Sequence, residues 1–389
     1  MIELFDERPL ENVLGAEMFR PQRIVYICPA KVARDQRLHK KLKTYFEHRH
    51  QKVELVFTKA RLYDAEALLK MFRQTAAKYP DCALDITGGT DAALFAAGLL
   101  SAESPIPVFT YSRRSNKFFS IRNAAFADGT PCQVRYTVED FFMMAGGSMR
   151  AGRVDNGILD QYLDVIDPFF AVYLKHRSDW NKIVTYIQRV SQPESDGYCP
   201  LDVSGAYTVK GERAGRISAP EEALRDLQKI GFLSGLAIDP EDGVRFRFRD
   251  RQIRTWLRDV GSVLELYVYK ACLDSGLFDD VRTSAVVDWE GDARANAVTN
   301  ELDVMCTRGV TPVFISCKTC DVKTEALNEL AILRDRFGGK IARAAIVTAE
   351  QGGTAMRNRA AELGISVIDL NDLSAGRIGT RIRKLMKNS

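Results

Sequence analysis

Two short segments near the C-terminal end of the chain carry the residues best suited to hydrolytic chemistry. The first, NELDVMCT, contains Glu301 and Asp303, and the second, VFISCK, contains Ser316 and Lys318. Carboxylates bind Mg²⁺ or Mn²⁺, hard ions that prefer oxygen ligands, and such an ion activates water and neutralises the charge developing on a phosphate. A lysine beside them orients or deprotonates the attacking water, or stabilises the transition state. The pattern therefore predicts a metal-dependent phosphodiesterase site.

Strand geometry decides whether these side chains can meet. Successive side chains of a strand point to opposite faces, so we expect Glu301 and Asp303 on one face and Leu302 and Val304 on the other. If the two strands pair across the short RGVTP turn, Asp303 becomes a neighbour of Lys318. Carboxylates and lysines are also common on the solvent side of a hairpin, and this alternative stays open.

A third carboxylate, Glu265, lies in the preceding segment IRTWLRDVGSVLELYVYKACLDS, which we expect to form one long helix that ends at Gly276. Ser262 and Gly261 precede Glu265 by three and four residues, so the turn below it is small and open. Glu265 can then reach the metal. The alternative is an exposed helix glutamate that pairs with Arg258 or another neighbour.

The order of these elements resembles the PD-(D/E)xK restriction-endonuclease-like superfamily over about residues 255–389. A helix with Glu265 is followed by the Glu-Leu-Asp strand, by the Ile-Ser-Cys-Lys-Thr strand at 315–319, and by a further helix. The resemblance implies that Asp303 is the central aspartate of the metal site and that Lys318 is the catalytic lysine.

Ser316 departs from this family pattern, because the family usually has Asp or Glu two residues before the lysine. A hydroxyl is a neutral and poor substitute for a carboxylate in holding a divalent ion. We therefore expect Glu265 and Glu301 to supply the missing charge, with the backbone carbonyl of Cys317 as a further metal ligand.

The N-terminal part alternates short apolar runs with helical stretches from residue 23 to about 112. The runs RIVYIC, KVELVF, CALDIT and PVFTYS are separated by amphipathic segments. This alternation predicts a Rossmann-like parallel sheet covered by helices on both faces. A hairpin with Ser115-Asn116 at its turn is expected to follow.

The ends of two of these strands indicate where a ligand binds, since open α/β sheets bind ligands at the carboxyl ends of their strands. Glycine at positions 88 and 89 lets backbone approach a ligand, and Thr90 or Asp91 can cap the next helix. The G-x-G-x-x-G fingerprint is absent, which argues against NAD. The candidate ligand-binding residues are Pro29, Ala30, Lys31, Thr87, Gly88, Gly89, Thr90 and Asp91.

These segments, RIVYIC-PAK and CALDIT-GGTD, resemble the CARF domain, the Rossmann-like sensor of cyclic oligoadenylates in type III CRISPR defence. Together the two halves resemble the CARF-plus-nuclease ancillary effectors of antiviral defence. The resemblance implies a homodimer that binds cyclic tetra-adenylate at the CARF interface and then cuts DNA, RNA or both. A two-fold ring on a two-fold axis meets the same contacts from each protomer.

Between these parts, residues 155–250 change to helical segments followed by the alternating strand DGVRFRFRD, which predicts a winged-helix-like module. We therefore predict three domains of an α/β chain: a CARF-like sensor at 1–150, a winged-helix-like linker module at 151–251 and a restriction-endonuclease-like domain at 252–389. The module is expected to act as a spacer or in dimerisation. The rival function is a transcription regulator that binds DNA through this module without catalysis.

Composition sets broad limits on this interpretation. Hydrophobic residues make up 46% of the 389 residues, which is enough for globular cores in two or three domains. With 55 basic and 51 acidic residues the net charge is only +4, so affinity for phosphate must come from local clusters. The basic C-terminal segment RIGTRIRKLMK is one such cluster, or a solvated last helix. The acidic start and the absence of a run of about 18 apolar residues predict a cytoplasmic chain with no membrane contact.

Overall fold

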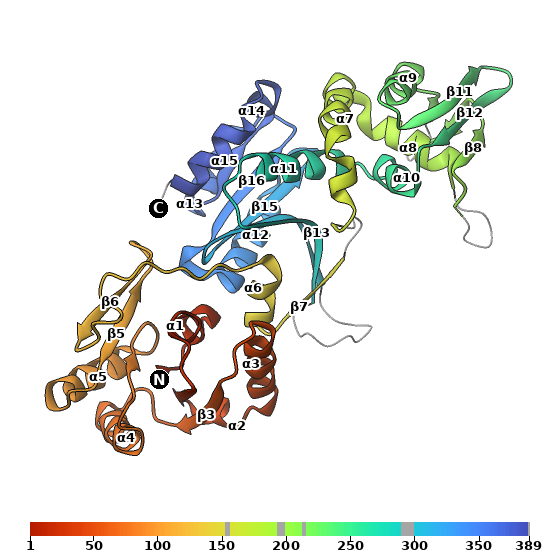
Figure 1. Cartoon of the computed structure of the whole chain (residues 1–389). Helices are drawn as coiled ribbons and strands as arrows, with labels where there is room; N and C mark the ends of the chain where they lie inside the picture. Colours follow the sequence, from red (N-terminus) through yellow and green to blue (C-terminus); the bar gives the residue numbers. More distant parts are fainter. Residues whose placement is uncertain (152–155, 193–198, 212–214, 289–298, 388–389) are drawn as a thin grey trace.

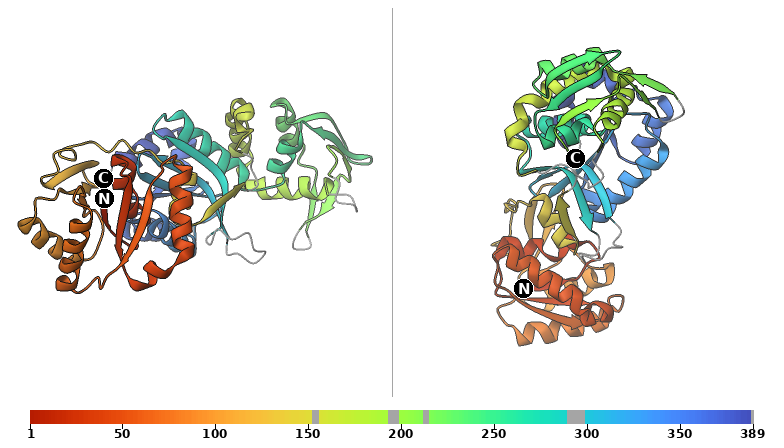
Figure 2. Two further views of the ribbon diagram at one scale, coloured as in Figure 1. Left: turned by 60° about the horizontal axis from the view of Figure 1, so that its bottom comes forward. Right: turned by 90° about the vertical axis from the view of Figure 1, so that its right-hand side faces the viewer.

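The chain folds into three units that lie in a row. The computed structural model describes residues 1–151, 156–192, 199–211, 215–288 and 299–387. Figures 1 and 2 show the C-terminal unit between the N-terminal unit and the middle module, so the order in space differs from the order along the chain. Within the described ranges, every helix is too short or too polar to cross a membrane.

The N-terminal unit is built on a six-stranded sheet with the order β3-β2-β1-β4-β5-β6. The strands β1 to β5 run parallel, and β6 pairs antiparallel with β5. Helices α1 and α3 cover one face of this sheet and α4 and α5 the other, each pair over its own apolar cluster. The predicted Rossmann-like fold is confirmed. The elements are β1 (Ile2–Leu4), η1 (Pro9–Asn12), α1 (Leu14–Phe19), β2 (Arg23–Cys28), α2 (Ala30–Arg34), α3 (Gln36–His48), β3 (Glu54–Lys59), α4 (Ala65–Lys78), β4 (Leu84–Asp85), α5 (Asp91–Glu103), β5 (Val108–Ser112) and β6 (Lys117–Arg122).

The predicted hairpin is formed by β5 and β6. Asn116 lies at its turn with a φ of +51°, a left-handed conformation that asparagine tolerates better than most residues. The chain then passes through α6 (Val138–Met144) to β7 (Ser148–Ala151), which pairs with β13 of the C-terminal unit. A strand from the N-terminal stretch thus completes the C-terminal sheet, and the division at residues 150 and 251 stays a prediction.

The middle module combines the helices α7 to α10 with the three-stranded antiparallel sheet β11-β12-β8, which is the predicted winged-helix-like arrangement. Its core is aromatic and includes Phe169, Trp180, Phe232 and Trp256. The elements are η2 (Leu159–Tyr162), α7 (Leu163–Lys175), η3 (Arg177–Asp179), α8 (Trp180–Val190), β8 (Asp202–Gly205), β9 (Thr208–Lys210), β10 (Arg216–Ser218), α9 (Glu221–Lys229), β11 (Leu233–Asp239), β12 (Gly243–Phe248) and α10 (Arg251–Leu257).

The C-terminal unit contains a second six-stranded sheet, with the order β17-β16-β15-β14-β13-β7. Its β7 to β15 side is antiparallel and its β15 to β17 side is parallel. Helices α11 and α15 pack on one face, and α12 packs on the other. The elements are α11 (Ser262–Asp274), β13 (Asp280–Asp288), β14 (Thr299–Arg308), β15 (Thr311–Lys318), α12 (Thr324–Phe337), η4 (Gly339–Ile341), β16 (Arg343–Thr348), α13 (Thr354–Glu362), β17 (Ser366–Ile368), α14 (Leu370–Ser374) and α15 (Ile378–Lys387).

The prediction of one long helix before this sheet is wrong, because the chain forms two helices there. α10 ends at Leu257 and α11 begins at Ser262. The Asp259 carboxylate accepts hydrogen bonds from the backbone N–H groups of Gly261 (3.1 Å) and Ser262 (2.8 Å), and so starts a new helix. As a result, Glu265 lies in the first turn of α11 rather than in the middle of a long helix.

Candidate active site

Asp303 on β14 is the centre of the contacts that join the two predicted catalytic strands. Its Oδ2 atom accepts a hydrogen bond from the backbone N–H of Cys317 (2.7 Å) and another from the Ser316 hydroxyl (3.1 Å). The Lys318 ammonium lies 3.6 Å from the same oxygen. Asp303 and Lys318 are therefore neighbours, and the carboxylate is held in one orientation by two hydrogen-bond donors and one ion pair from β15.

The expected alternation along β14 is only partly right. Leu302 packs in the apolar cluster under α12, whereas Val304 packs in the cluster under α11, so these two residues do not share a face. The neighbouring strand β13 is irregular at the same level, because Ser284 has a φ of +49°. Glu301 and Asp303 nevertheless line the same small cavity.

This cavity has a volume of about 60 Å³ and lies between the sheet and α12. Four of the predicted residues line it, namely Glu301, Asp303, Ser316 and Lys318. Glu329 of α12 lines it too, and sequence reasoning missed this residue because an exposed helix glutamate has no distinguishing local pattern. The structure thus brings a further carboxylate to the predicted site.

Glu265 approaches from the opposite side, on α11. Its exposed fraction is 6%, so the alternative of an exposed surface glutamate is wrong. Oε2 accepts a hydrogen bond from the Ser284 hydroxyl (3.2 Å), and the first turn of a helix favours a negative charge. Oε1 lies over Gly261, where an added Cβ atom would be only 2.9 Å away. The small residue before Glu265 does leave room for its side chain.

Cys317 lies within electrostatic reach of both acidic groups. Burial raises the pKa of its thiol well above the usual value, and the carboxylates of Asp303 and Glu265 act in the same direction. Asp303 and Glu265 therefore lie on either side of the end of β15. The carboxylate oxygens of Asp303, Glu265 and Glu301 do not all lie within 4.8 Å of one another. In the described ranges, only one other group of three metal-ligating side chains meets that limit.

That other group consists of His176, Glu222 and Asp226 in the middle module. Lys175 and Lys229 approach Asp226 to 2.7 and 2.8 Å, and the ring of His176 lies 2.9 Å from it. These cations hold the pKa of the Asp226 carboxyl well below its usual range. The group is an internally compensated ion network.

The C-terminal unit matches a known domain family over most of its length. Residues 252–388 match the family model described as "Card1-like, endonuclease domain". The C-terminal unit is therefore similar to Card1-like endonuclease domains. No curated protein matches the sequence of the whole chain. The predicted nuclease class is confirmed by this match, whereas the roles of the individual residues stay predictions.

Three solved structures are similar in fold to this chain. Protein VC1899 from Vibrio cholerae has a TM-score of 0.76 at 18% identity, and the match covers 99% of this chain and 97% of that one. Can2 from Sulfobacillus thermosulfidooxidans, in complex with cyclic tetra-adenylate, has a TM-score of 0.70 at 16% identity, with 99% and 98% covered. A type III CRISPR defence DNA nuclease activated by cyclic oligoadenylate has a TM-score of 0.50 at 14% identity, with 96% and 50% covered.

The glycine turn predicted to bind a ligand follows β4 in the N-terminal unit. The backbone N–H of Gly89 donates to Asp6 Oδ2 (3.1 Å), and Gly89 has a φ of +100°. A Cβ atom on Gly88 would lie 3.0 Å from the carbonyl oxygen of Leu4. Both glycines are therefore required for close packing against the end of β1, in addition to any contact with a ligand.

The remaining ligand-binding candidates surround this turn. Thr87 Oγ1 accepts from the backbone N–H of Tyr111 (3.0 Å), and Thr90 Oγ1 caps α5 by accepting from Ala93 (3.3 Å). Asp91 is the first residue of α5 and is exposed. Pro29 caps α2, which begins with Ala30 and Lys31. Because β1 separates β2 from β4 in the sheet, these segments flank the loop that follows β1.

That loop carries charged residues that the sequence did not single out. Asp6 pairs with Arg8 (2.9 Å), Arg8 lies 3.5 Å from Glu11, and Glu11 also contacts Arg113 from the end of β5. This network connects the Gly89 turn with a cavity of about 120 Å³ at the end of α12. α12 is the helix that brings Glu329 to the Card1-like endonuclease site.

The basic C-terminal cluster is partly compensated within the endonuclease domain. Arg377 and Arg381 pair with Asp372 at 3.1 and 2.8 Å. One carboxylate therefore offsets part of their charge, while Arg383, Lys384 and Lys387 are exposed on α15.

Proposed function

We propose that the chain is a divalent-metal-dependent nuclease that a cyclic oligoadenylate activates through the N-terminal unit. The contact of Asp303 with Lys318 inside a Card1-like endonuclease domain carries this proposal. The acidic side chains on either side of the end of β15 suit Mg²⁺ or Mn²⁺, since both ions prefer oxygen ligands. The substrate is DNA, RNA or both.

Each residue of the site has a defined task under this proposal. Asp303, Glu301 and Glu265 hold the ion, which supplies an activated water and neutralises charge on the phosphate. Lys318 keeps its ammonium 3.6 Å from Asp303 and directs it at the attacking water or the leaving oxygen. Ser316 is a hydrogen-bond donor to Asp303, so it orients that carboxylate instead of binding the ion.

The proposed activator is cyclic tetra-adenylate, the ligand found in the Can2 structure that shares this fold. We place it at the loop after β1 and at the turns that carry Lys31 and Gly88, because ligands bind at the carboxyl ends of such strands. A homodimer gives a ring-shaped ligand the same contacts twice. α5 exposes Leu94, Phe95 and Leu99 by 38%, 63% and 38%, which supports a two-fold contact through this helix.

The rival function is a ligand-sensing transcription regulator, in which Asp303 and Lys318 are surface residues without a catalytic role. Against it, Asp303 is only 17% exposed and accepts two hydrogen bonds from β15, and Glu265 is buried beneath the same strand. A regulator needs none of these contacts. The rival reading is therefore not favoured.

The test is a cleavage assay on single-stranded and double-stranded DNA and RNA, with and without cyclic tetra-adenylate, across Mg²⁺ and Mn²⁺ titrations. We expect cleavage that needs both the ring and the ion, and that Lys318→Ala abolishes. Lys182→Ala, an exposed lysine of the middle module, serves as the matched control and is expected to cleave at the parental rate. Equal cleavage by Lys318→Ala and the parental chain overturns the proposed site.

A further inference from the structure

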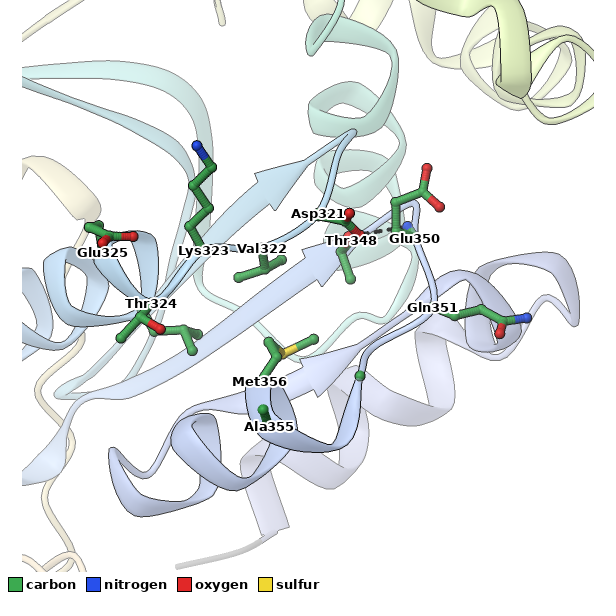
Figure 3. Close-up of a pocket in the computed structure, with 12 residues that line it drawn as sticks. Asp321, Val322, Lys323, Thr324, Glu325, Thr348, Glu350, Gln351, Ala355 and Met356 are labelled. Atoms are coloured by element: carbon green, nitrogen blue, oxygen red, sulfur yellow. Dashed lines mark hydrogen bonds between the residues drawn. The ribbon is translucent and has the colours of Figure 1, made fainter.

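A second and larger cavity opens beside the proposed catalytic lysine. It has a volume of about 520 Å³ and lies where β15 and β16 end and where α12 and α13 begin (Figure 3). Small-molecule and cofactor sites commonly measure about 300–1,000 Å³, so this space accommodates a group of nucleoside size. The mechanism proposed above makes no use of it.

The position of this cavity relates it directly to the scissile phosphate. Thr348, which lines the cavity, pairs with Lys318 in the parallel ladder, and the backbone N–H of Ala349 donates to the Lys318 carbonyl (3.0 Å). Neighbouring strands lie about 5 Å apart. A nucleic acid whose phosphate lies at Lys318 therefore has an adjacent nucleotide within reach of the cavity.

The floor of the cavity is apolar. It is formed by Val322, Leu327 and Met356, and Figure 3 shows the side chains of Val322 and Met356 pointing into the same space. Apolar and thioether groups pack well against the face of an aromatic ring. A nucleobase fits such a floor, whereas a sugar or a phosphate gains nothing from it.

The rim of the cavity is acidic. Asp321, Glu325 and Glu350 contribute three carboxylates, against the ammonium of Lys323 and the Arg177 guanidinium that pairs with Glu350. This balance disfavours a phosphate. Carboxylates accept hydrogen bonds from the exocyclic amino groups of cytosine, adenine and guanine, and thymine and uracil have no such group.

The wall that carries Glu350 is fixed before any ligand arrives. Arg177 of the middle module lies 2.8 Å from Glu350 and also donates to the carbonyl of Ala349 (3.1 Å). The Glu350 backbone N–H donates to Thr348 Oγ1 (3.1 Å), a bond drawn in Figure 3. A preformed wall reduces the ordering that binding requires.

We propose that this cavity binds the nucleobase next to the scissile phosphate and prefers bases that carry an exocyclic amino group. The proposal rests on the nuclease function proposed above and assigns the substrate preference of that site. A base reaches the cavity only when it leaves its stack and its pairing partner. Unpaired strands are therefore the preferred substrate, with thymine or uracil disfavoured at one position beside the cut.

The first test sequences the cut ends of randomised single-stranded DNA and RNA pools. For the parental chain we expect thymine or uracil to be depleted about tenfold at one flanking position, the effect of one good base contact. Met356→Trp fills the apolar floor and is expected to reduce this depletion to less than about twofold. Glu350→Gln replaces one acceptor oxygen by an NH₂ donor and is expected to weaken the depletion.

Asn358→Trp is the matched control, because Asn358 is exposed on α13 and does not line the cavity. It is expected to keep the parental preference. Cut ends without a flanking base preference overturn the proposal, as does an unchanged preference in Met356→Trp.

A binding measurement separates this proposal from the proposed function. The full-length Lys318→Ala protein is mixed with single-stranded hexanucleotides that contain one 2-aminopurine, whose fluorescence reports its stacking environment. We expect a fluorescence change that Met356→Trp removes and Asn358→Trp keeps. If the parental chain cleaves nothing while this pattern is observed, the nuclease assignment fails and the base site stands. Identical fluorescence in all three proteins overturns the base site.

Discussion

Asp85 makes the stability of the N-terminal unit depend on pH in a direction opposite to that of most carboxylates. It lies on β4 opposite Glu3 of β1, and both side chains are fully buried. Burial raises the pKa of the Asp85 carboxyl from 3.8 to about 7, and it raises the pKa of Glu3 as well. Asp85 Oδ1 accepts from the backbone N–H of Thr87 (2.8 Å), at the start of the turn proposed to bind the activator.

The sign of the effect follows from proton binding. Between pH 3.8 and about 7 the folded chain holds a proton on Asp85 that the unfolded chain has released, so folding stability falls as the pH rises through this window. The change in pKa corresponds to a loss of about 4 kcal/mol across the window. Asp85→Asn is neutral at every pH and keeps the acceptor for Thr87. It is therefore expected to remove most of this loss and to be more stable than the parental chain at pH 7.5.

Tryptophan fluorescence does not report on this unit, because all three tryptophans, Trp180, Trp256 and Trp289, follow it in the sequence. We propose urea titrations at pH 5, 6, 7 and 8 with hydrogen exchange read from peptides that cover β1 and β4. Asp128→Asn, on an exposed carboxylate, is the matched control and is expected to follow the parental pH dependence. A parental stability that rises between pH 5 and 7, or an Asp85→Asn protein with the parental slope, refutes the reasoning.

Three further predictions concern the site, the sensor and the dimer. Glu265→Gln keeps the shape of the side chain and is expected to lower metal-dependent cleavage about 10- to 100-fold. High Mn²⁺ is expected to rescue part of this loss, and Ser316→Ala to have a milder effect. If Glu265→Gln cleaves at the parental rate across a metal titration, the carboxylate of Glu265 has a structural role only. A Cβ atom at position 88 would lie 3.0 Å from Leu4 and Asp6, so Gly88→Val displaces the end of β1. This variant is expected to weaken activator binding at least tenfold in a calorimetric titration. The control Gly215→Val, in open space, is expected to bind normally. Unchanged affinity of Gly88→Val removes the turn from the site. Phe95→Glu places a charge on the exposed face of α5 and is expected to convert dimer to monomer in sedimentation, while Glu66→Gln on α4 leaves the dimer intact; a dimeric Phe95→Glu protein excludes this face.

Local patterns predicted the elements whose signal is contained within them. The amphipathic segment TEALNELAILRDRF forms α12 with both ends as expected, and Asn116 occupies the turn of the predicted hairpin. The proximity of Asp303 and Lys318 was also predictable, because it needs only the pairing of two adjacent strands. Each of these features depends on residues close together in the sequence.

Features that depend on distant residues could not be predicted in this way. β1 has three residues, too few for a periodic signal, yet it occupies the middle of the first sheet. The break between α10 and α11 occurs inside a pattern that suits a continuous helix, at hydrogen bonds from the backbone N–H groups of Gly261 and Ser262 to the Asp259 carboxylate. The irregular φ of Ser284 and the approach of Glu329 from α12 arise only once the strands and helices are packed.

The departure at Ser316 gains a physical explanation from its contact with Asp303. A carboxylate at this position would face the Asp303 carboxylate at about the distance of the present hydrogen bond, 3.1 Å, and only a bound cation would offset the repulsion. Serine removes that repulsion and donates a hydrogen bond, so the strands stay packed without an ion. The cost is one fewer charged ligand. Under the proposed function, Glu265 and Glu301 must therefore move closer to Asp303 for tight metal binding. α12 lines both the catalytic cavity and the cavity shared with the N-terminal unit, so it is the element through which an activator can drive that movement.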